Sequence, residues 1–344
     1  MIDQSFWVDR KVLITGHTGF KGSWLACYLN YLGSKVYGLS DYEIISENYN
    51  RINKDNIFQN EYNLNISDTN DELIKVFNLD FDFVFHLAAQ GVVSTAKIKP
   101  LETLSTNIIG SFNIMNLVND NEKINGLVVS TTDKVYSDTA NSNLEESSLG
   151  GKEFYSASKA SAEHIIAAFI NTMSRKDLNI GVVRSGNVLG GGDGGNDRIV
   201  TDIINSLKNN DDIYLRNPES IRPWQYILDS LNGYLMTAEY CVKNNQNEVF
   251  NIGSSQNSEK KVLDLTENII KNWNNDKNIE IKQKQNLFYE SEFLRINSQK
   301  ANDILGWKPL FDLEMISASI VEWYKSDEDG ITMNQIDKFH KMSS

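Results

Sequence analysis

Hydrophobic residues in the first half of the chain fall into short continuous runs, separated by longer stretches of mixed character. The runs long enough to be buried strands are 11–15, 35–39, 83–87, 126–130 and 181–185. Between them, apolar residues recur at helical spacing, as they do over 20–32 and 155–169. This alternation predicts an α/β fold of the Rossmann type, in which a doubly wound parallel sheet carries helices on both faces.

The first predicted strand runs into a glycine turn. The sequence Val-Leu-Ile-Thr-Gly-His-Thr-Gly-Phe-Lys-Gly places Gly16, Gly19 and Gly22 between the strand and the following helix. Glycines at this position allow a tight turn and let backbone N–H groups approach a pyrophosphate at the positive end of the helix. The turn therefore predicts a dinucleotide site, against the alternative of a glycine turn that serves packing alone.

The second predicted strand ends at Ser40 and Asp41, about 20 residues after the turn, where such folds meet the adenosine ribose. An acid there favours NAD over NADP, although Asp41 could equally cap a turn. We expect the remaining cofactor contacts from the glycine turn, from two later strand ends and from the helix over 100–118. The predicted cofactor residues are Gly16, Thr18, Gly19, Phe20, Lys21, Gly22, Ser40, Asp41, Asn65, Ile66, Leu87, Ala88, Ala89, Gln90, Asn107, Tyr155 and Lys159.

The regular alternation breaks down after the fifth strand, where a glycine-rich run covers 186–195. We therefore predict a cofactor-binding domain over 1–186, to which later segments return, and a smaller lobe over 187–330 that mainly binds substrate. The charged end of the chain, 331–344, is expected to be a frayed tail. Residues 42–60 are expected to be a loop with a short helix, and Ser67 or Asp68 to cap the helix that ends near Asn78.

Composition and net charge argue against several kinds of partner and site. The 344 residues carry a formal charge of -13, which argues against nucleic acid and anionic membranes as partners. The two cysteines, Cys27 and Cys241, lie in apolar helical contexts and form no metal-binding or disulfide pattern. No stretch of about 18 apolar residues occurs, so we expect a cytoplasmic, soluble protein without a metal.

Reactive side chains gather after the fourth strand. Thr132, Asp133 and Lys134 follow its end, where open α/β sheets bind ligands. Tyr155 and Lys159 are four residues apart, so they project from one helix face. An ammonium beside a phenol lowers the phenol pKa and makes it a usable base. The alternative is an ordinary amphipathic helix, which the glycine turn and the nearby strand-end threonine make less probable.

Arginines supply the cations for an anionic diphosphate, because a guanidinium fork matches phosphate oxygens. We expect substrate contacts in the second lobe and at the strand ends. The predicted substrate-binding residues are Gln90, Thr132, Asn187, Arg198, Arg216, Arg222 and Arg295.

Several segments together resemble the CDP-glucose 4,6-dehydratases, NAD-dependent members of the extended short-chain dehydrogenase/reductase superfamily. They are Gly-His-Thr-Gly-Phe-Lys-Gly at 16–22, His-Leu-Ala-Ala-Gln at 86–90, Thr-Asp-Lys at 132–134, Tyr-Ser-Ala-Ser-Lys at 155–159 and Arg-Pro-Trp-Gln at 222–225. The similarity extends from about Phe6 to Trp323. The Tyr/Lys pair and glycine turn are typical of the whole superfamily, whereas the 16–22, Asp-Lys and Arg-Pro-Trp-Gln segments are more specific.

The resemblance implies a nucleotide-diphosphate hexose, most simply CDP-D-glucose, as substrate. Tyr155, held as phenolate by Lys159, would take the proton of the sugar 4-hydroxyl, with Thr132 bonded to the same oxygen. Lys134 would then remove the C5 hydrogen and Asp133 protonate the departing 6-hydroxyl, leaving a 4-keto-6-deoxy sugar. The implied catalytic residues are Thr132, Asp133, Lys134, Tyr155 and Lys159.

Two other functions stay open. An epimerase or C4 oxidoreductase acting on a nucleotide sugar needs the Tyr/Lys pair but not the acid at Asp133. A non-catalytic NAD(H)-binding protein of the same fold needs neither. By analogy with related enzymes, we expect a homodimer formed through the helices over 100–118 and 156–173.

Overall fold

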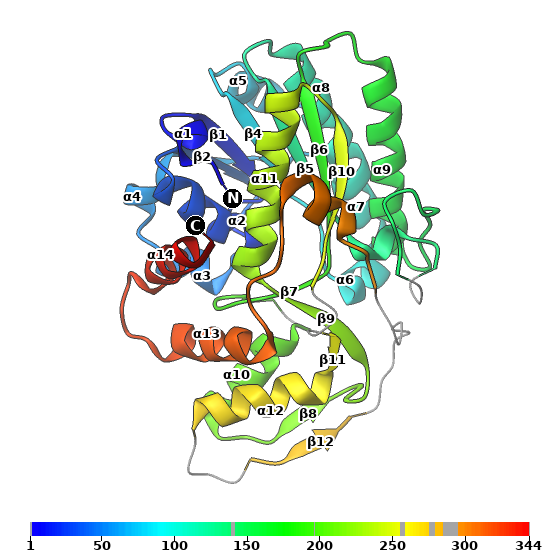
Figure 1. The fold of residues 1–344 in the computed structure, drawn as a ribbon. Coiled ribbons are helices and arrows are strands. Elements are labelled where there is room, and N and C mark those ends of the chain that lie inside the picture. The colour runs from blue at the N-terminus through cyan, green and yellow to red at the C-terminus, as the bar shows by residue number, and fades with distance from the viewer. Residues whose placement is uncertain are drawn as a thin grey trace.

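The structure is a computed structural model, and it describes residues 2–138, 142–195, 197–254, 259–274, 279–284 and 295–343. Figure 1 shows a large sheet with helices on both faces and, below it, a smaller lobe built from the second half of the chain. The sheet has seven parallel strands in the order β10-β6-β5-β4-β1-β2-β3. Their bounds are β1 Lys11–Thr15, β2 Lys35–Ser40, β3 Phe58–Asn63, β4 Phe83–His86, β5 Gly126–Thr132, β6 Asn179–Ser185 and β10 Glu248–Ile252.

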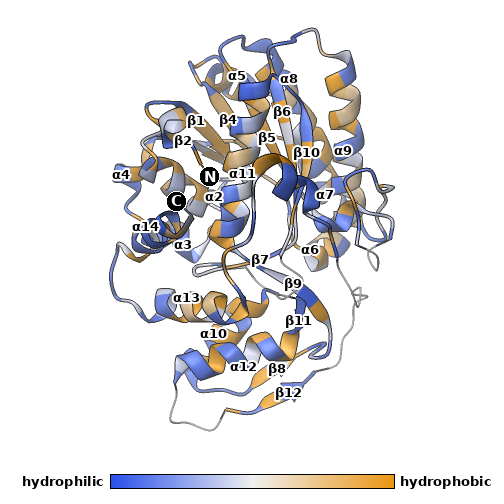
Figure 2. Cartoon of the chain, in the orientation of Figure 1, coloured by the Kyte–Doolittle hydropathy of each residue, from blue (hydrophilic) through white to orange (hydrophobic). Residues whose placement is uncertain are grey.

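Alternate residues of the inner strands face opposite sides of the sheet, and the buried side chains accordingly form two cores. Val12 and Ile14 pack with one core, whereas Leu13 between them packs with the other. Helices cover both faces of the sheet, so the inner strands β1, β4, β5 and β6 each contain an apolar run. Figure 2 shows the hydropathy of the strands and of the helices around them. The prediction of a doubly wound Rossmann-type sheet is confirmed.

The first core packs on α2 Phe20–Tyr31 and α11 Ile227–Asn244, and the second on α5 Asp71–Phe77, α8 Ser111–Asp120 and α9 Phe154–Thr172. Short helical segments connect these elements. They are α1 Gln4–Trp7, α3 Glu47–Arg51, α4 Lys54–Ile57, α6 Val93–Ile98, α7 Pro100–Leu104, the π-helix η1 Ser105–Gly110 and the 3₁₀ turn η2 Asp133–Val135.

In the part of the smaller lobe that the structure describes, two short sheets lie with helices α10, α12 and α13 (Figure 1). One sheet joins β7 Asn187–Leu189, β9 Ile221–Tyr226 and β11 Glu259–Lys261, and the other joins β8 Ile213–Leu215 to β12 Ile281–Gln283. The helices are α10 Ile199–Asn209, α12 Val262–Trp273 and α13 Leu313–Lys325, and the π-helix η4 Ala301–Leu305 lies close to β10. β10 and α11 contribute to the large sheet and its core, so the chain returns to the sheet after Asn187; the domain limits given above stay a prediction.

Several local predictions were wrong. Residues 42–60 are not only a loop with a short helix, because β3 starts at Phe58 and forms the edge of the sheet. Asn70, rather than Ser67 or Asp68, caps α5 by accepting from the amides of Glu72 and Leu73. The helix expected over 100–118 is interrupted by η1, where the Ser111 hydroxyl bonds the Asn107 carbonyl at 2.7 Å and competes with the regular helix bond.

The expected frayed tail is instead the helix α14 Ile331–Ser343, which packs against α2. Its apolar side chains Ile331, Ile336 and Phe339 are buried in the first core. Among the described residues, no helix combines the length and apolar character that crossing a membrane requires.

Candidate active site

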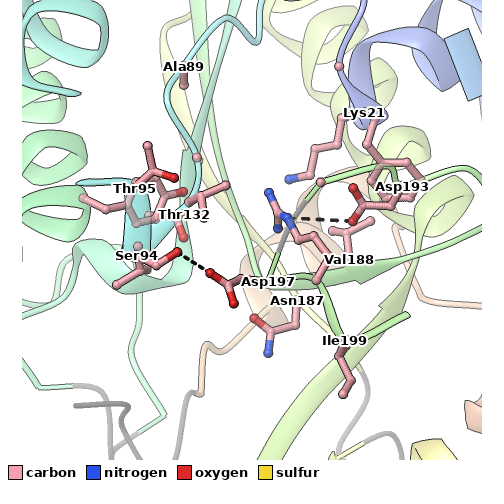
Figure 3. A pocket seen from close by; sticks show the side chains of 18 of the residues that line it. Lys21, Ala89, Ser94, Thr95, Thr132, Asn187, Val188, Asp193, Asp197 and Ile199 are labelled. Atoms are coloured by element: carbon pink, nitrogen blue, oxygen red, sulfur yellow. Dashed lines mark hydrogen bonds and ion pairs between the residues drawn. The ribbon is translucent and has the colours of Figure 1, made fainter. Parts of the chain in front are cut away.

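A cavity of about 780 Å³ lies between the carboxyl ends of the sheet strands and the smaller lobe. Most predicted site residues line it, namely Gly16, Gly19, Phe20, Lys21, Gly22, Leu87, Ala89, Gln90, Thr132, Lys134, Tyr155, Lys159, Asn187, Arg198, Arg216 and Arg222. Figure 3 shows Thr132 on one wall of the cavity and Lys21 on another. The structure therefore brings the glycine turn, the strand-end cluster and the Tyr/Lys helix to one space.

The glycine turn is packed too closely for any side chain. Gly16 has a φ of 76°, and a Cβ added there would lie 2.7 Å from the backbone nitrogen of Ala88. A Cβ on Gly22 would lie 2.2 Å from the Gly16 carbonyl oxygen. Gly19 is the N-cap of α2, so the first amides of the helix reach the cavity with no capping side chain in front of them. A backbone N–H cradle at a helix N-terminus fits the pyrophosphate of a dinucleotide.

Two lysines lie behind this turn. Lys159 donates to the Ser130 carbonyl at 3.0 Å, and Lys21 reaches the Tyr234 hydroxyl at 3.3 Å. The Ser130 and Tyr234 hydroxyls bond each other at 2.7 Å and so connect the two. Withdrawal from bulk water lowers the pKa of each lysine to about 8, and the charge of Lys21 lowers the pKa of Lys159 further. An anionic pyrophosphate near these ammonium groups would relieve their unfavourable burial.

The carboxylate of Asp133 is the centre of the strand-end cluster. Its Oδ1 accepts bonds from the Thr132 hydroxyl and the Lys134 ammonium, both at 3.0 Å, while Lys134 also reaches the Asn187 side chain at 3.4 Å. The second oxygen, Oδ2, is buried and has no hydrogen-bond partner within the described residues; it lies beside Gly186. A buried, unpartnered carboxyl oxygen is costly unless a ligand or a proton satisfies it.

Tyr155 completes this cluster through a side-chain hydrogen bond with Thr132. Withdrawal from bulk water raises the pKa of the phenol, and the positive charges of Lys134 and Arg198 and the bond with Thr132 oppose that rise. The expected partner Lys159 lies on the same helix face, but its ammonium is engaged by the Ser130 carbonyl. The cations that act on the phenol in this structure are therefore Lys134 and Arg198.

Side-chain contacts hold the helix α9, which carries Tyr155, at its N-terminus and again near its middle. Glu153 caps it by accepting from the amides of Tyr155 and Ser156, and the Ser156 hydroxyl completes a capping box. One turn after Lys159, the carboxylate of Glu163 forms a fork with Arg184 on β6 and accepts from Thr131 on β5 at 2.6 Å. The start of α9 is thus tied to both strands whose ends carry the cluster.

Other predicted cofactor residues lie outside the cavity lining. Asn107 is buried and holds the Gln90 backbone and the Ser158 hydroxyl, and the Thr18 and Ser40 hydroxyls bond each other at 2.9 Å. Asp41 is exposed and accepts from the amide of Glu43. The remaining ones are Asn65, which bonds Ser67, Ile66, which packs against Gly110, and Ala88, which adjoins Gly16. Their cofactor roles stay predictions.

The predicted arginines differ in their surroundings. Arg198 and Arg216 line the cavity but are paired with Asp193 at 3.9 Å and Asp197 at 3.1 Å, respectively. Arg222 also lines the cavity, whereas Arg295 lies outside it and donates to Glu259 at 3.0 Å. Sequence reasoning missed Asp193, Asp197, Ser94 and Thr95, which line the same cavity (Figure 3). Asp193 and Asp197 could have been found from the sequence, because they are acidic residues at the end of the glycine-rich run.

Comparisons with known proteins agree with this geometry. Residues 13–320 match the protein family described as GDP-mannose 4,6 dehydratase. The chain is 33% identical over 340 residues to CDP-glucose 4,6-dehydratase of Salmonella typhimurium, with 95% of this chain and 93% of the relative covered. The chain belongs to the GDP-mannose 4,6 dehydratase family. A second relative is dTDP-glucose 4,6-dehydratase of the same organism. It is 27% identical, with 91% of this chain and 92% of that protein covered.

Solved structures show the same fold. An NAD-dependent NDP-hexosamine 5,6-dehydratase, TunA, superposes with a TM-score of 0.78 at 23% identity, covering 93% of this chain and 99% of the other. The UDP-glucuronic acid 4-epimerase of Bacillus cereus, solved with NAD, superposes with a TM-score of 0.77 at 21% identity, covering 92% of this chain and 99% of the other. The predicted resemblance to CDP-glucose 4,6-dehydratases is confirmed by the sequence relatives.

Proposed function

We propose that this protein is an NAD-dependent nucleotide-sugar 4,6-dehydratase whose substrate is CDP-D-glucose. The observation that carries the proposal is the contact of Asp133 with both Thr132 and Lys134 beside Tyr155. Oxidation at C4 alone needs a base for the hydroxyl proton, whereas loss of water also needs an acid and a second base near C5 and C6. The proposal is supported by Thr132, Lys134 and Tyr155, which line the cavity, and by the contacts of Asp133 with Thr132 and Lys134.

The proposed mechanism assigns the proton transfers to Tyr155, Lys134 and Asp133. Tyr155 takes the proton of the sugar 4-hydroxyl, and Thr132 bonds the same oxygen. The resulting 4-ketone makes the C5 hydrogen acidic, so that Lys134 can remove it. Asp133 gives a proton to the 6-hydroxyl, which leaves as water. Lys134 later returns a proton to C5, and the product is a 4-keto-6-deoxy sugar.

The 3.0 Å contact between Lys134 and Asp133 supports these assignments. Elimination needs Lys134 as a neutral amine and Asp133 as a protonated carboxyl. This state differs from the Lys134–Asp133 ion pair only in that one proton lies on the carboxyl instead of the amine. The two groups can therefore reach their reactive forms without a change in the total charge of the site. Asn187 bonds the same ammonium and holds it toward the cavity.

NAD, when bound, would supply reversible storage of a hydride. The residues proposed to hold it are the amides at the start of α2, the ammonium groups of Lys21 and Lys159, and the strand end at Leu87. The relative solved with NAD and the NAD-dependent dehydratase of the same fold support this choice of cofactor.

The activity is tested with the purified protein, NAD and a panel of CDP-, dTDP-, UDP- and GDP-hexoses. We expect CDP-glucose to lose one water, as detected by mass spectrometry. A product isomeric with the substrate would instead identify an epimerase, which several structural relatives are. Binding of NAD with no conversion of any sugar would indicate a non-catalytic protein.

Asp133→Asn separates dehydration from simple oxidation. The variant keeps the shape of the side chain but cannot give up a proton as an acid, so it should reduce the bound cofactor and stop before water is lost. Absorbance of the reduced cofactor and mass spectrometry measure the two steps independently. Unchanged release of water from Asp133→Asn would contradict the role given to this carboxyl.

A homodimer is proposed through the outer face formed by α6 to α9. Its apolar side chains include Ile98, Leu101, Ile109, Phe112 and Phe154, which are between 43% and 80% exposed. α7 and η1 pack beside α9, so these residues belong to adjoining elements. An apolar face of this extent on adjoining helices favours contact with a second copy. We also propose a cytoplasmic location, supported by the sequence composition given above.

A further inference from the structure

Asp197 connects two walls of the cavity. Its Oδ2 accepts a hydrogen bond from the Ser94 hydroxyl at 2.7 Å, and its Oδ1 pairs with the Arg216 guanidinium at 3.1 Å. Ser94 lies on α6, beside the large sheet, whereas Arg216 directly follows β8 in the smaller lobe. Figure 3 shows the carboxylate of Asp197 reaching Ser94 across this part of the cavity. One side chain thus links the cofactor side to the substrate side.

The backbone of Asp197 adopts a conformation that L residues rarely use. Its φ is 59°, in the left-handed region, where aspartate and asparagine are tolerated better than most residues. Asp197, Ser94 and Arg216 all line the cavity, and the side chain of Asp197 is 44% exposed. A non-glycine residue held in this region at a ligand cavity points to a functional constraint.

The charge on Arg216 is already balanced by acids. Asp197 contacts the guanidinium. The carboxylate of Asp202 lies within electrostatic range of it. Burial raises the pKa of the Asp202 carboxyl, and the charges of Lys284 and Arg216 partly oppose that rise. A phosphate that bound Arg216 would come to lie against the Asp197 carboxylate. Like charges a few ångströms apart repel, so Asp197 must weaken phosphate binding or give up its position on Arg216.

We propose that Asp197 is a specificity-determining residue that competes with the diphosphate of the substrate for Arg216, while Ser94 holds its carboxylate against the opposite wall. The inference rests on the proposed function only in assuming that the ligand carries a diphosphate. A ligand gains the Arg216 contact only if its own anionic group displaces the carboxylate. The residue therefore lowers the affinity for ligands that carry the diphosphate, and it leaves the affinity for uncharged nucleosides and sugars unchanged, because these make no exchange at Arg216.

Binding of CDP to the NAD-saturated protein, measured by titration calorimetry, tests the competition without any turnover. Asp197→Asn removes the charge but keeps the oxygen that Ser94 bonds, and asparagine tolerates the left-handed backbone. We expect CDP to bind this variant about four- to tenfold more tightly than the parent. Ser94→Ala keeps the charge and removes the bridge, so its CDP affinity should change by less than about twofold. Cytidine, which lacks phosphate, should bind all three proteins equally.

A double-mutant cycle assigns the gain to Arg216. Arg216→Gln should weaken CDP binding, and adding Asp197→Asn in that background should give no further gain. Unchanged or weaker CDP binding by Asp197→Asn would overturn the proposal, as would an equal gain in the Arg216→Gln background. Failure of CDP, UDP, dTDP and GDP alike to bind would also overturn it. If the variants bind CDP as expected but no nucleotide sugar is turned over, the result would contradict the proposed function and still support the competition.

Discussion

Replacing Glu163 by glutamine should cost far more stability than a typical surface change. Glu163 and Arg184 face each other with side chains 4% and 5% exposed, and Arg184 donates to both carboxylate oxygens. Glutamine is nearly isosteric and keeps one acceptor, but it leaves the guanidinium buried without its countercharge. Removing one partner of a buried pair costs about 3–5 kcal/mol, and the retained acceptor and the Tyr136 contact at 2.8 Å place the expected loss near the lower figure.

Equilibrium urea unfolding of the parent, Glu163→Gln and two controls measures this loss. Asp80→Asn removes the partner of Lys123 in a pair whose side chains are 57% and 64% exposed, and should leave the unfolding midpoint unchanged. The double replacement Glu163→Leu with Arg184→Met removes both charges and should recover much of the stability lost by Glu163→Gln. If Glu163→Gln unfolds at the same urea concentration as Asp80→Asn, the reasoning from buried charge is wrong.

Three further outcomes follow from the cavity and the outer helix face. Gly22→Ala should abolish NAD binding in a calorimetric titration, because its Cβ would lie 2.2 Å from the backbone oxygen of Gly16, which has no room to move; NAD affinity equal to that of the parent would contradict this. Lys21 has its pKa lowered to about 8, so NAD affinity should be constant below that pH and fall as the ammonium loses its proton above it; Lys21→Met should weaken this dependence, and the remainder comes from Lys159, whose pKa is also lowered to about 8. If the proposed homodimer forms, Leu101→Glu should convert it to a monomer in light scattering, whereas the control Leu144→Glu, at a residue 47% exposed elsewhere, should not.

The sequence predicted the inner strands well because of where they lie in the sheet. A strand buried on both faces is mostly apolar, and β1, β4, β5 and β6 each contain a continuous apolar run, at 12–14, 83–85, 126–129 and 180–183. β3 is the edge strand, and its sequence Phe-Gln-Asn-Glu-Tyr-Asn buries only the first residue fully. A polar edge strand has no apolar run to reveal it. The helix α14 was missed for a similar reason, because its buried residues are spaced among charged ones and only packing against α2 shows their role.

The cluster at Thr132, Asp133 and Lys134 was predictable because carboxyl ends of parallel strands meet at one sheet edge. Asp197 and Ser94 were not, since they are 103 residues apart and belong to different lobes. No periodicity relates them, and their contact depends on how the loop after the glycine-rich run crosses the cavity. Sequence patterns therefore identified the functional side chains within each element, whereas the contacts between side chains of different elements were found only in the tertiary structure.

The surroundings of Tyr155 show what this distinction means for function. A spacing of four residues places Lys159 on the same helix face, but the direction of its ammonium is set by the Ser130 carbonyl of β5. The cations that oppose the raised pKa of the phenol come from two other elements, Lys134 after β5 and Arg198 before α10. The pKa of Tyr155 consequently depends on several elements around the cavity, and a change at Arg198 should alter it although 43 residues separate the two in sequence.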